Sequence, residues 1–113
     1  MKMIAAYIKP NMLSKVAIAL HDVEGLTGLS VTKIQGFGRS RAKGAENRIV
    51  ENLVEYIPHL KIEIFCRDEH IDKIVSIVQK NAHTGLRGDG KIYVVNVEHA
   101  VRISTGEAGE NAV

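Results

Sequence analysis

Residues 59–78, HLKIEIFCRDEHIDKIVSIV, contain a strand pattern followed at once by a helix pattern, and this combination decides the fold. In HLKIEIFC every second residue is apolar, which predicts a strand with one buried face formed by Leu60, Ile62, Ile64 and Cys66. Asp68 or Glu69 then begins a helix whose inward face is predicted from apolar residues at helical spacing, Ile71, Ile74, Val75 and Val78. The segment therefore predicts a strand and a helix packed against each other.

A similar unit comes earlier in the chain. Residues 1–8 are apolar and predict a buried strand, after which Asn11 is expected to cap a helix that Gly25 ends. LSVTKIQG, residues 29–36, and KIYVVNV, residues 91–97, have the alternation of strands. The order strand, helix, strand, long loop, strand, helix, strand predicts an α+β, ferredoxin-like (double split βαβ) fold with an antiparallel sheet.

The predicted sheet has one uncovered face. The 113 residues form a single domain, 1–113, in which both helices lie on the same side of the sheet. Nothing else in the chain is large enough to cover the other side. We therefore expect the uncovered face to pack against copies of the same chain, most simply in a closed ring.

Composition excludes several classes of function. The formal net charge is only +2 and no run of basic residues exceeds two, which argues against nucleic-acid binding. The apolar stretch at the N-terminus is interrupted by Lys9 and Pro10, so neither a signal peptide nor membrane insertion is predicted, and a cytoplasmic protein is expected. Cys66 is the single cysteine and is expected in the core.

Residues 85–91, GLRGDGK, nearly match the phosphate-binding P-loop. Ile92 replaces the Ser or Thr that would hold Mg²⁺, and the segment runs from a helix into a strand, which is the reverse of a P-loop. Its two central glycines can still let backbone N–H groups converge on an anion, with Lys91 adding charge. The alternative is a plain turn with Gly85 as a helix C-cap, and this segment alone does not decide between them.

Five motifs in order make the chain resemble the PII family of signal-transduction proteins: IKP (8–10), GFGR (36–39), LKIEI (60–64), TGLRGDGKIYV (84–94) and VRISTGEAGE (101–110). The resemblance implies a homotrimer that binds the adenine nucleotides ATP, ADP or AMP in clefts between subunits. It also implies a T-loop at about 37–56, between the second and third strands, which controls a target protein. It further implies a phosphate-binding B-loop at about 84–91 and a C-terminal loop at about 102–113.

The resemblance also implies which residues bind the nucleotide. Near the base it places Ser30, Glu63 and Phe65, and near the phosphates it places residues from three loops. These are Gly38, Arg39, Gly88, Asp89, Gly90, Lys91, Arg102 and Ser104. Arg102 would approach from a neighbouring subunit, so the cleft would be completed by another chain. No catalytic residue and no metal ligand is implied.

Four positions depart from the family pattern. Ser40 replaces a glutamine that helps to bind Mg²⁺ and 2-oxoglutarate, and His59 replaces a lysine that pairs with 2-oxoglutarate, so no 2-oxoglutarate response is expected and Mg²⁺ binding stays open. Ser104 replaces a phosphate-binding arginine, which favours ADP or AMP over ATP. Asn52 stands where some members have a uridylylated tyrosine, so that modification is not expected.

The sequence also bears on three other functions. An enzyme that hydrolyses nucleotides is not predicted, because no carboxylate pair or Ser–His–Asp pattern surrounds the glycines. The five histidines form no HxH or HxxxH pair, which leaves a metal-tolerance-related trimer as an alternative without local support. A sensor of another small anion, such as bicarbonate, is the second alternative. The target protein is expected to be a transporter or a metabolic enzyme.

Overall fold

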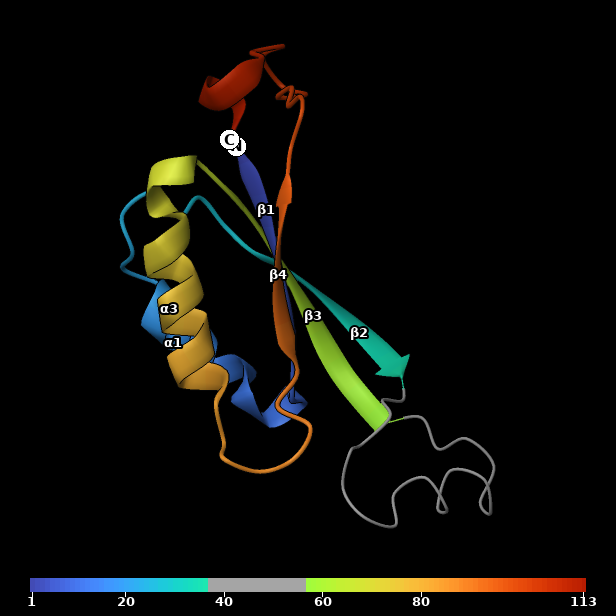
Figure 1. Ribbon diagram of the computed structural model, residues 1–113. Helices are drawn as coiled ribbons and strands as arrows, with labels where there is room; N and C mark the ends of the chain where they lie inside the picture. The colour runs from blue at the N-terminus through green and yellow to red at the C-terminus, as the bar shows by residue number, and fades with distance from the viewer. Residues whose placement is uncertain (37–56) are drawn as a thin grey trace.

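The computed structural model describes residues 1–36 and 57–113 as one four-stranded antiparallel sheet with two helices on one face (Figure 1). The strands are β1 (Lys2–Ile8), β2 (Ser30–Gly36), β3 (Ile57–Cys66) and β4 (Lys91–Asn96), in the spatial order β2-β3-β1-β4. The helices are α1 (Leu13–Leu20) and α3 (Ile71–Ala82). This arrangement confirms the predicted ferredoxin-like fold.

The core lies between the sheet and the two helices. The alternation predicted for β3 is confirmed, because Leu60 is 7 % exposed and Ile62, Ile64 and Cys66 are completely buried. The helices contribute their apolar stripes to the same cluster, through Val16, Leu20, Ile74 and Val78. Burial raises the pKa of the Cys66 thiol, as expected for a thiol enclosed by apolar side chains.

β1 is one of the two inner strands of the sheet, because it pairs with a strand on each side. It lies antiparallel to β3, with Ile4 opposite Ile64, and antiparallel to β4, with Ile4 opposite Val94. The start of β1 is held at a third point, since the Met1 amino group donates to Asp68 at 2.8 Å. The backbone N–H of Val97 also donates to the Met1 carbonyl at 3.1 Å.

The start of the first helix differs from the prediction. Asn11 caps no helix, since it lies inside a 3-10 turn (Pro10–Met12) that precedes α1, and α1 has no side-chain cap. The physical reason is Pro10, which fixes its own backbone angle and begins the turn one residue before Asn11. The helix also ends at Leu20, before the predicted stop at Gly25. The second helix also begins later than predicted, because Asp68 and Glu69 lie in a similar 3-10 turn, Asp68–His70, and α3 itself begins at Ile71.

The sheet face away from the helices exposes apolar side chains. Directly paired residues share a face, so the pairs Ser30–Glu63, Ala5–Tyr93 and Tyr7–Lys91 place these residues on the open side. Tyr93 is 50 % exposed there, and its ring meets that of Tyr7 edge to face, with centroids 5.9 Å apart. Val95 and Phe65, on the same face, are 47 % and 44 % exposed.

Candidate functional site

The segment 84–91, here called the glycine loop, joins the end of α3 to the start of β4 at one end of the sheet (Figure 1). Gly88 and Gly90 have φ angles of +80° and +97°, in the region that favours glycine. At Gly90 the loop backbone lies directly against β1, since a Cβ atom there would overlap the carbonyl group of Tyr7. The two glycines therefore give the loop a conformation that other residues rarely adopt.

A carboxylate holds the glycine loop from inside. The backbone N–H groups of Thr84 and Gly85 donate to Asp89 Oδ2 at 2.9 and 3.3 Å, and the Thr84 hydroxyl donates to Asp89 Oδ1. Lys9 Nζ lies 3.2 Å from Oδ1, and His83 Nδ1 lies 3.3 Å from Oδ2. These hydrogen bonds, chiefly those from Thr84, lower the pKa of Asp89 below its ordinary value. Asp89 therefore shapes the loop, and its charge is offset within the loop.

Thr84 connects three parts of this cluster. Its hydroxyl oxygen accepts from Lys9 Nζ at 3.0 Å and from the backbone N–H of Leu86 at 3.1 Å, while its hydrogen goes to Asp89. Neither Lys9 nor Thr84 was among the predicted site residues. Both lay within motifs quoted above, but sequence spacing gives no sign that residues 9 and 84 meet.

Asp89→Asn is expected to reduce the acid sensitivity of the fold. An aspartate ordinarily titrates near pH 3.9. Since the folded-state pKa is lower, the stability contributed by the ionised carboxylate is fully present above about pH 4 and is lost as pH falls through the folded pKa. The variant should be less stable than wild type at pH 7, and the difference should shrink towards pH 2. Urea midpoints at several pH values measure this.

The matched control for that experiment is Asp22→Asn, because the Asp22 side chain is 98 % exposed. It should leave the pH profile of stability close to that of wild type. A constant difference between wild type and Asp89→Asn from pH 7 to pH 2 would contradict the assigned interactions of Asp89.

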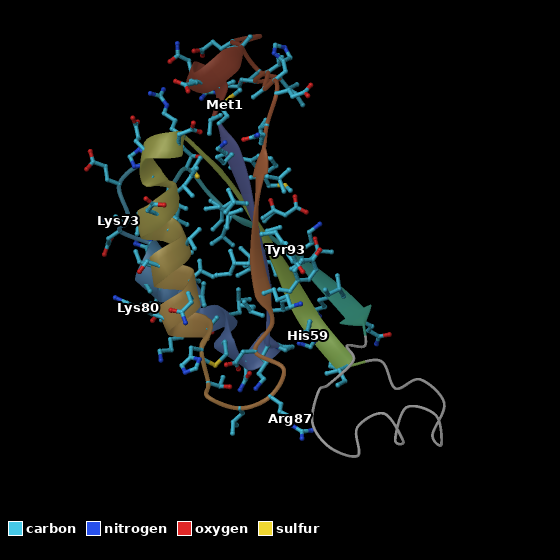
Figure 2. All side chains as sticks on the ribbon, viewed as in Figure 1. Met1, His59, Lys73, Lys80, Arg87 and Tyr93 are labelled. Carbon is cyan, nitrogen blue, oxygen red and sulfur yellow. The ribbon has the colours of Figure 1, made fainter. Side chains whose placement is uncertain are left out.

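Cationic and imidazole groups surround the loop on the open side. Lys91 begins β4 opposite Tyr7. His59 Nε2, on β3, lies 3.1 Å from the Gly88 carbonyl oxygen. Figure 2 shows His59 and Arg87 at this end of the sheet, whereas Lys73 and Lys80 project from α3. This end of the molecule thus combines an ordered glycine backbone with side chains suited to an anion.

A second set of predicted residues, Ser30, Glu63 and Phe65, lies elsewhere on the open face. Ser30 pairs with Glu63 across β2 and β3, and Glu63 forms an ion pair with Lys61 at 3.0 Å. Phe65 lines a cavity of about 350 Å³ near the chain termini, together with Met1, Thr27 and Val97. We call Ser30, Glu63 and Phe65 the β2–β3 group.

Arg102 and Ser104 lie in the C-terminal segment, where Val101 and Ala108 form an isolated bridge. Arg102 forms an ion pair with Glu107 at 3.4 Å and donates to the Asn111 carbonyl at 3.2 Å. Ser104 is exposed. The segment therefore contains a single β-bridge rather than a strand. The 3-10 turn Gly109–Ala112 closes this segment, with the Val113 N–H donating to the Glu110 carbonyl at 3.3 Å.

One chain does not bring all the predicted residues together. Phe65 and Lys91 pair with Met3 and Tyr7, four residues apart and on opposite sides of β1. Strand spacing therefore gives a separation of about 16 Å between the Cα atoms of Phe65 and Lys91. Gly38 and Arg39, like Ser40 and Asn52, lie outside the described residues. The glycine loop and the β2–β3 group are therefore two separate groups of predicted residues within one chain.

Across residues 1–36 and 57–113, no three His, Cys, Asp or Glu side chains gather closely enough to hold a metal ion. In this part of the chain no helix has the length and apolar character needed to span a membrane.

Comparison with known proteins agrees with the fold and the motifs. The family model described as nitrogen regulatory protein P-II matches residues 1–107. The chain is 44 % identical to nitrogen regulatory protein P-II of Azospirillum brasilense, 43 % to that of Pasteurella multocida, and 41 % to nitrogen regulatory protein GlnK of Escherichia coli K12. Each alignment covers 113 residues, the full length of both chains. The chain belongs to the nitrogen regulatory protein P-II family.

Proposed function

We propose that the protein is a cytoplasmic, homotrimeric regulator that binds adenine nucleotides between subunits and controls a target protein through residues 37–56. The observation that carries this proposal is the glycine loop, whose backbone is fixed by Asp89 and flanked by Lys91. Such a loop suits a phosphate chain, because backbone N–H groups and a lysine stabilise anionic oxygens.

The separation of the two groups of residues supports a cleft between subunits. Phe65 of the β2–β3 group and Lys91 of the glycine loop share the open face, but their Cα atoms lie about 16 Å apart by strand spacing. A nucleotide seated on one chain's glycine loop would meet the β2–β3 group of a neighbouring chain. The exposed Tyr93, Val95 and Phe65 give that face the apolar surface that a subunit interface needs.

The nucleotide preference follows from the charged groups. With serine at position 104, one phosphate-binding arginine fewer is present, so ADP or AMP should bind at least as well as ATP. The His59 ring already contacts the Gly88 carbonyl, and no 2-oxoglutarate effect is expected from it. We assign a regulatory rather than an enzymatic role, and the target is a transporter or a metabolic enzyme.

Lys91→Ala is expected to weaken ADP binding by about 10- to 150-fold, which corresponds to one lost charge-assisted hydrogen bond of about 1.5–3 kcal/mol. Isothermal titration calorimetry with ATP, ADP and AMP, with and without Mg²⁺, measures the effect. Light scattering on the same samples should give a mass near three times the 12.4 kDa of one chain.

Lys73→Ala provides the matched control, because Lys73 lies on α3, on the other side of the sheet from the open face (Figure 2). It should bind ADP like wild type. Absence of adenine nucleotide binding by the wild-type protein, or equal affinity of wild type and Lys91→Ala, would overturn the proposed function. Tighter ATP binding in the presence of 2-oxoglutarate would overturn the interpretation of Ser40 and His59.

A further inference from the structure

The imidazole of His59 links the beginning of β3 to the glycine loop. Its Nε2 atom lies 3.1 Å from the Gly88 carbonyl oxygen, although the two residues are 29 positions apart. Its Nδ1 atom lies 3.4 Å from the carbonyl oxygen of Ile57. The ring is half-buried on the open face, where its cross-strand neighbour is Ile34.

Both ring nitrogens face a carbonyl oxygen, which can only accept a hydrogen bond, and a neutral imidazole has one N–H group to donate. The shorter contact, from Nε2 to Gly88 at 3.1 Å rather than from Nδ1 to Ile57 at 3.4 Å, favours the N–H at Nε2. The nearby lysines have other partners, because Lys9 pairs with Asp89 and Lys61 pairs with Glu63. His59 is thus a donor to the loop backbone at a position where neither lysine serves that purpose.

The effect on the loop follows from the planarity of the peptide unit. In a trans peptide the C=O and the following N–H point in opposite directions. By holding the Gly88 carbonyl, His59 turns the backbone N–H of Asp89 away from the ring. Gly88 would otherwise be free to rotate, since glycine has the largest conformational freedom of any residue. The Asp89 side chain accepts from the Thr84 N–H at 2.9 Å, which restrains Asp89, the second residue of the same peptide.

We propose that His59 is a positioning residue of the nucleotide site. It fixes the Gly88–Asp89 peptide in the orientation that presents the loop's backbone N–H groups to phosphate, and it does so without touching the nucleotide. The inference rests on the proposed function, which supplies the phosphate ligand. It gives His59 a role in this chain that does not depend on 2-oxoglutarate.

The test compares His59→Leu, which removes the donor, with His59→Gln, whose amide can still donate to the Gly88 carbonyl. Calorimetry with ADP should show binding about 3- to 10-fold weaker for His59→Leu, the loss expected for one neutral hydrogen bond. His59→Gln should bind within about twofold of wild type by the same estimate. If His59 acted through packing alone, the ADP affinities of His59→Leu and His59→Gln would not differ according to whether the new side chain can donate a hydrogen bond.

His21→Leu is the matched control, since His21 is 83 % exposed and lies at the end of α1. It should bind ADP like wild type. If His59→Leu does not fold, His59→Asn replaces it, because its shorter amide stops short of the loop. The His59→Asn variant is then expected to bind ADP more weakly than the His59→Gln variant.

Two outcomes would overturn the inference. If wild type binds ADP and the donor-lacking variant binds it equally well, the inference fails while the proposed function stands. If wild type binds no ADP, both fail together. Nitrogen NMR of the imidazole at pH 8.5 provides a measurement that needs no nucleotide: the Nε2–H tautomer is expected, and the Nδ1–H tautomer would overturn the assigned contact.

Discussion

Gly90→Ala is expected to destabilise the protein by about 3 to 5 kcal/mol, combining backbone strain with overpacking. Gly90 has a φ of +97°, which costs energy for any residue with a Cβ atom. The added methyl group would also overlap the Tyr7 carbonyl and lie 2.7 Å from its carbon atom. Because the obstacle is the backbone of β1, no side-chain rotation can relieve it. Nucleotide binding should be lost with the loop conformation.

Substitutions at two other glycines measure the cost of backbone strain separately from the cost of steric overlap. Gly85→Ala meets only the strain, since Gly85 has a φ of +78° and no neighbouring atom within 4 Å, and should cost about 1 kcal/mol. Gly28→Ala meets neither and should be close to neutral. Urea unfolding at one fixed protein concentration measures all three, because the stability of an oligomer depends on concentration. A Gly90→Ala variant no less stable than Gly85→Ala would contradict the close approach to β1.

Ile64→Ala is expected to cost about 2 to 5 kcal/mol, the range for removing a large buried aliphatic side chain. Ile64 is completely buried in the middle of β3, opposite Ile4 on β1, and it faces the helices. A cavity at this point removes contacts from the sheet and from the helix layer together. A typical domain has only about 5 to 15 kcal/mol of stability, so the variant should unfold at much lower urea concentrations.

Ile64→Val tests whether the loss scales with the volume removed, and about 0.5 to 1.5 kcal/mol is expected. Ile18→Ala is the matched surface control, because Ile18 is 76 % exposed on α1, and its effect should stay within about 0.5 kcal/mol. Equal losses for the buried and the exposed isoleucine would contradict the assignment of the core.

The sequence pattern predicted most of the fold because burial acts on every second residue of a strand and every third or fourth residue of a helix. The alternation from Leu60 to Cys66 placed β3 and its buried face correctly. The start of α1 was wrong, because the capping rule applied to Asn11 ignores the 3-10 turn that Pro10 favours. For β2, only pairing settles the faces, with Val31 opposite Ile62 on the helix side.

The candidate site was predicted less completely, for a different physical reason. The glycine loop was visible because its residues are adjacent in sequence. The cluster of Lys9, Thr84 and Asp89 depends on two segments 75 residues apart, and no local pattern reports such a contact. His59 was noticed for the lysine that it replaces, whereas its observed partner is the Gly88 carbonyl. The base-side residues Ser30 and Glu63 were predicted only through family resemblance.

The place of β1 in the sheet has a consequence for synthesis on the ribosome. β1 is the first strand made, yet it pairs with β3 and β4 and not with β2. From Ile8, where β1 ends, to Lys91, where β4 begins, about 83 residues must be translated, which takes about 4 to 17 seconds at ordinary rates. β3 is complete at Cys66, so for the last part of that time β1 lacks only β4. Closure of the sheet is therefore an event of the nearly complete chain, and nascent β1 is a natural segment for a chaperone to shield.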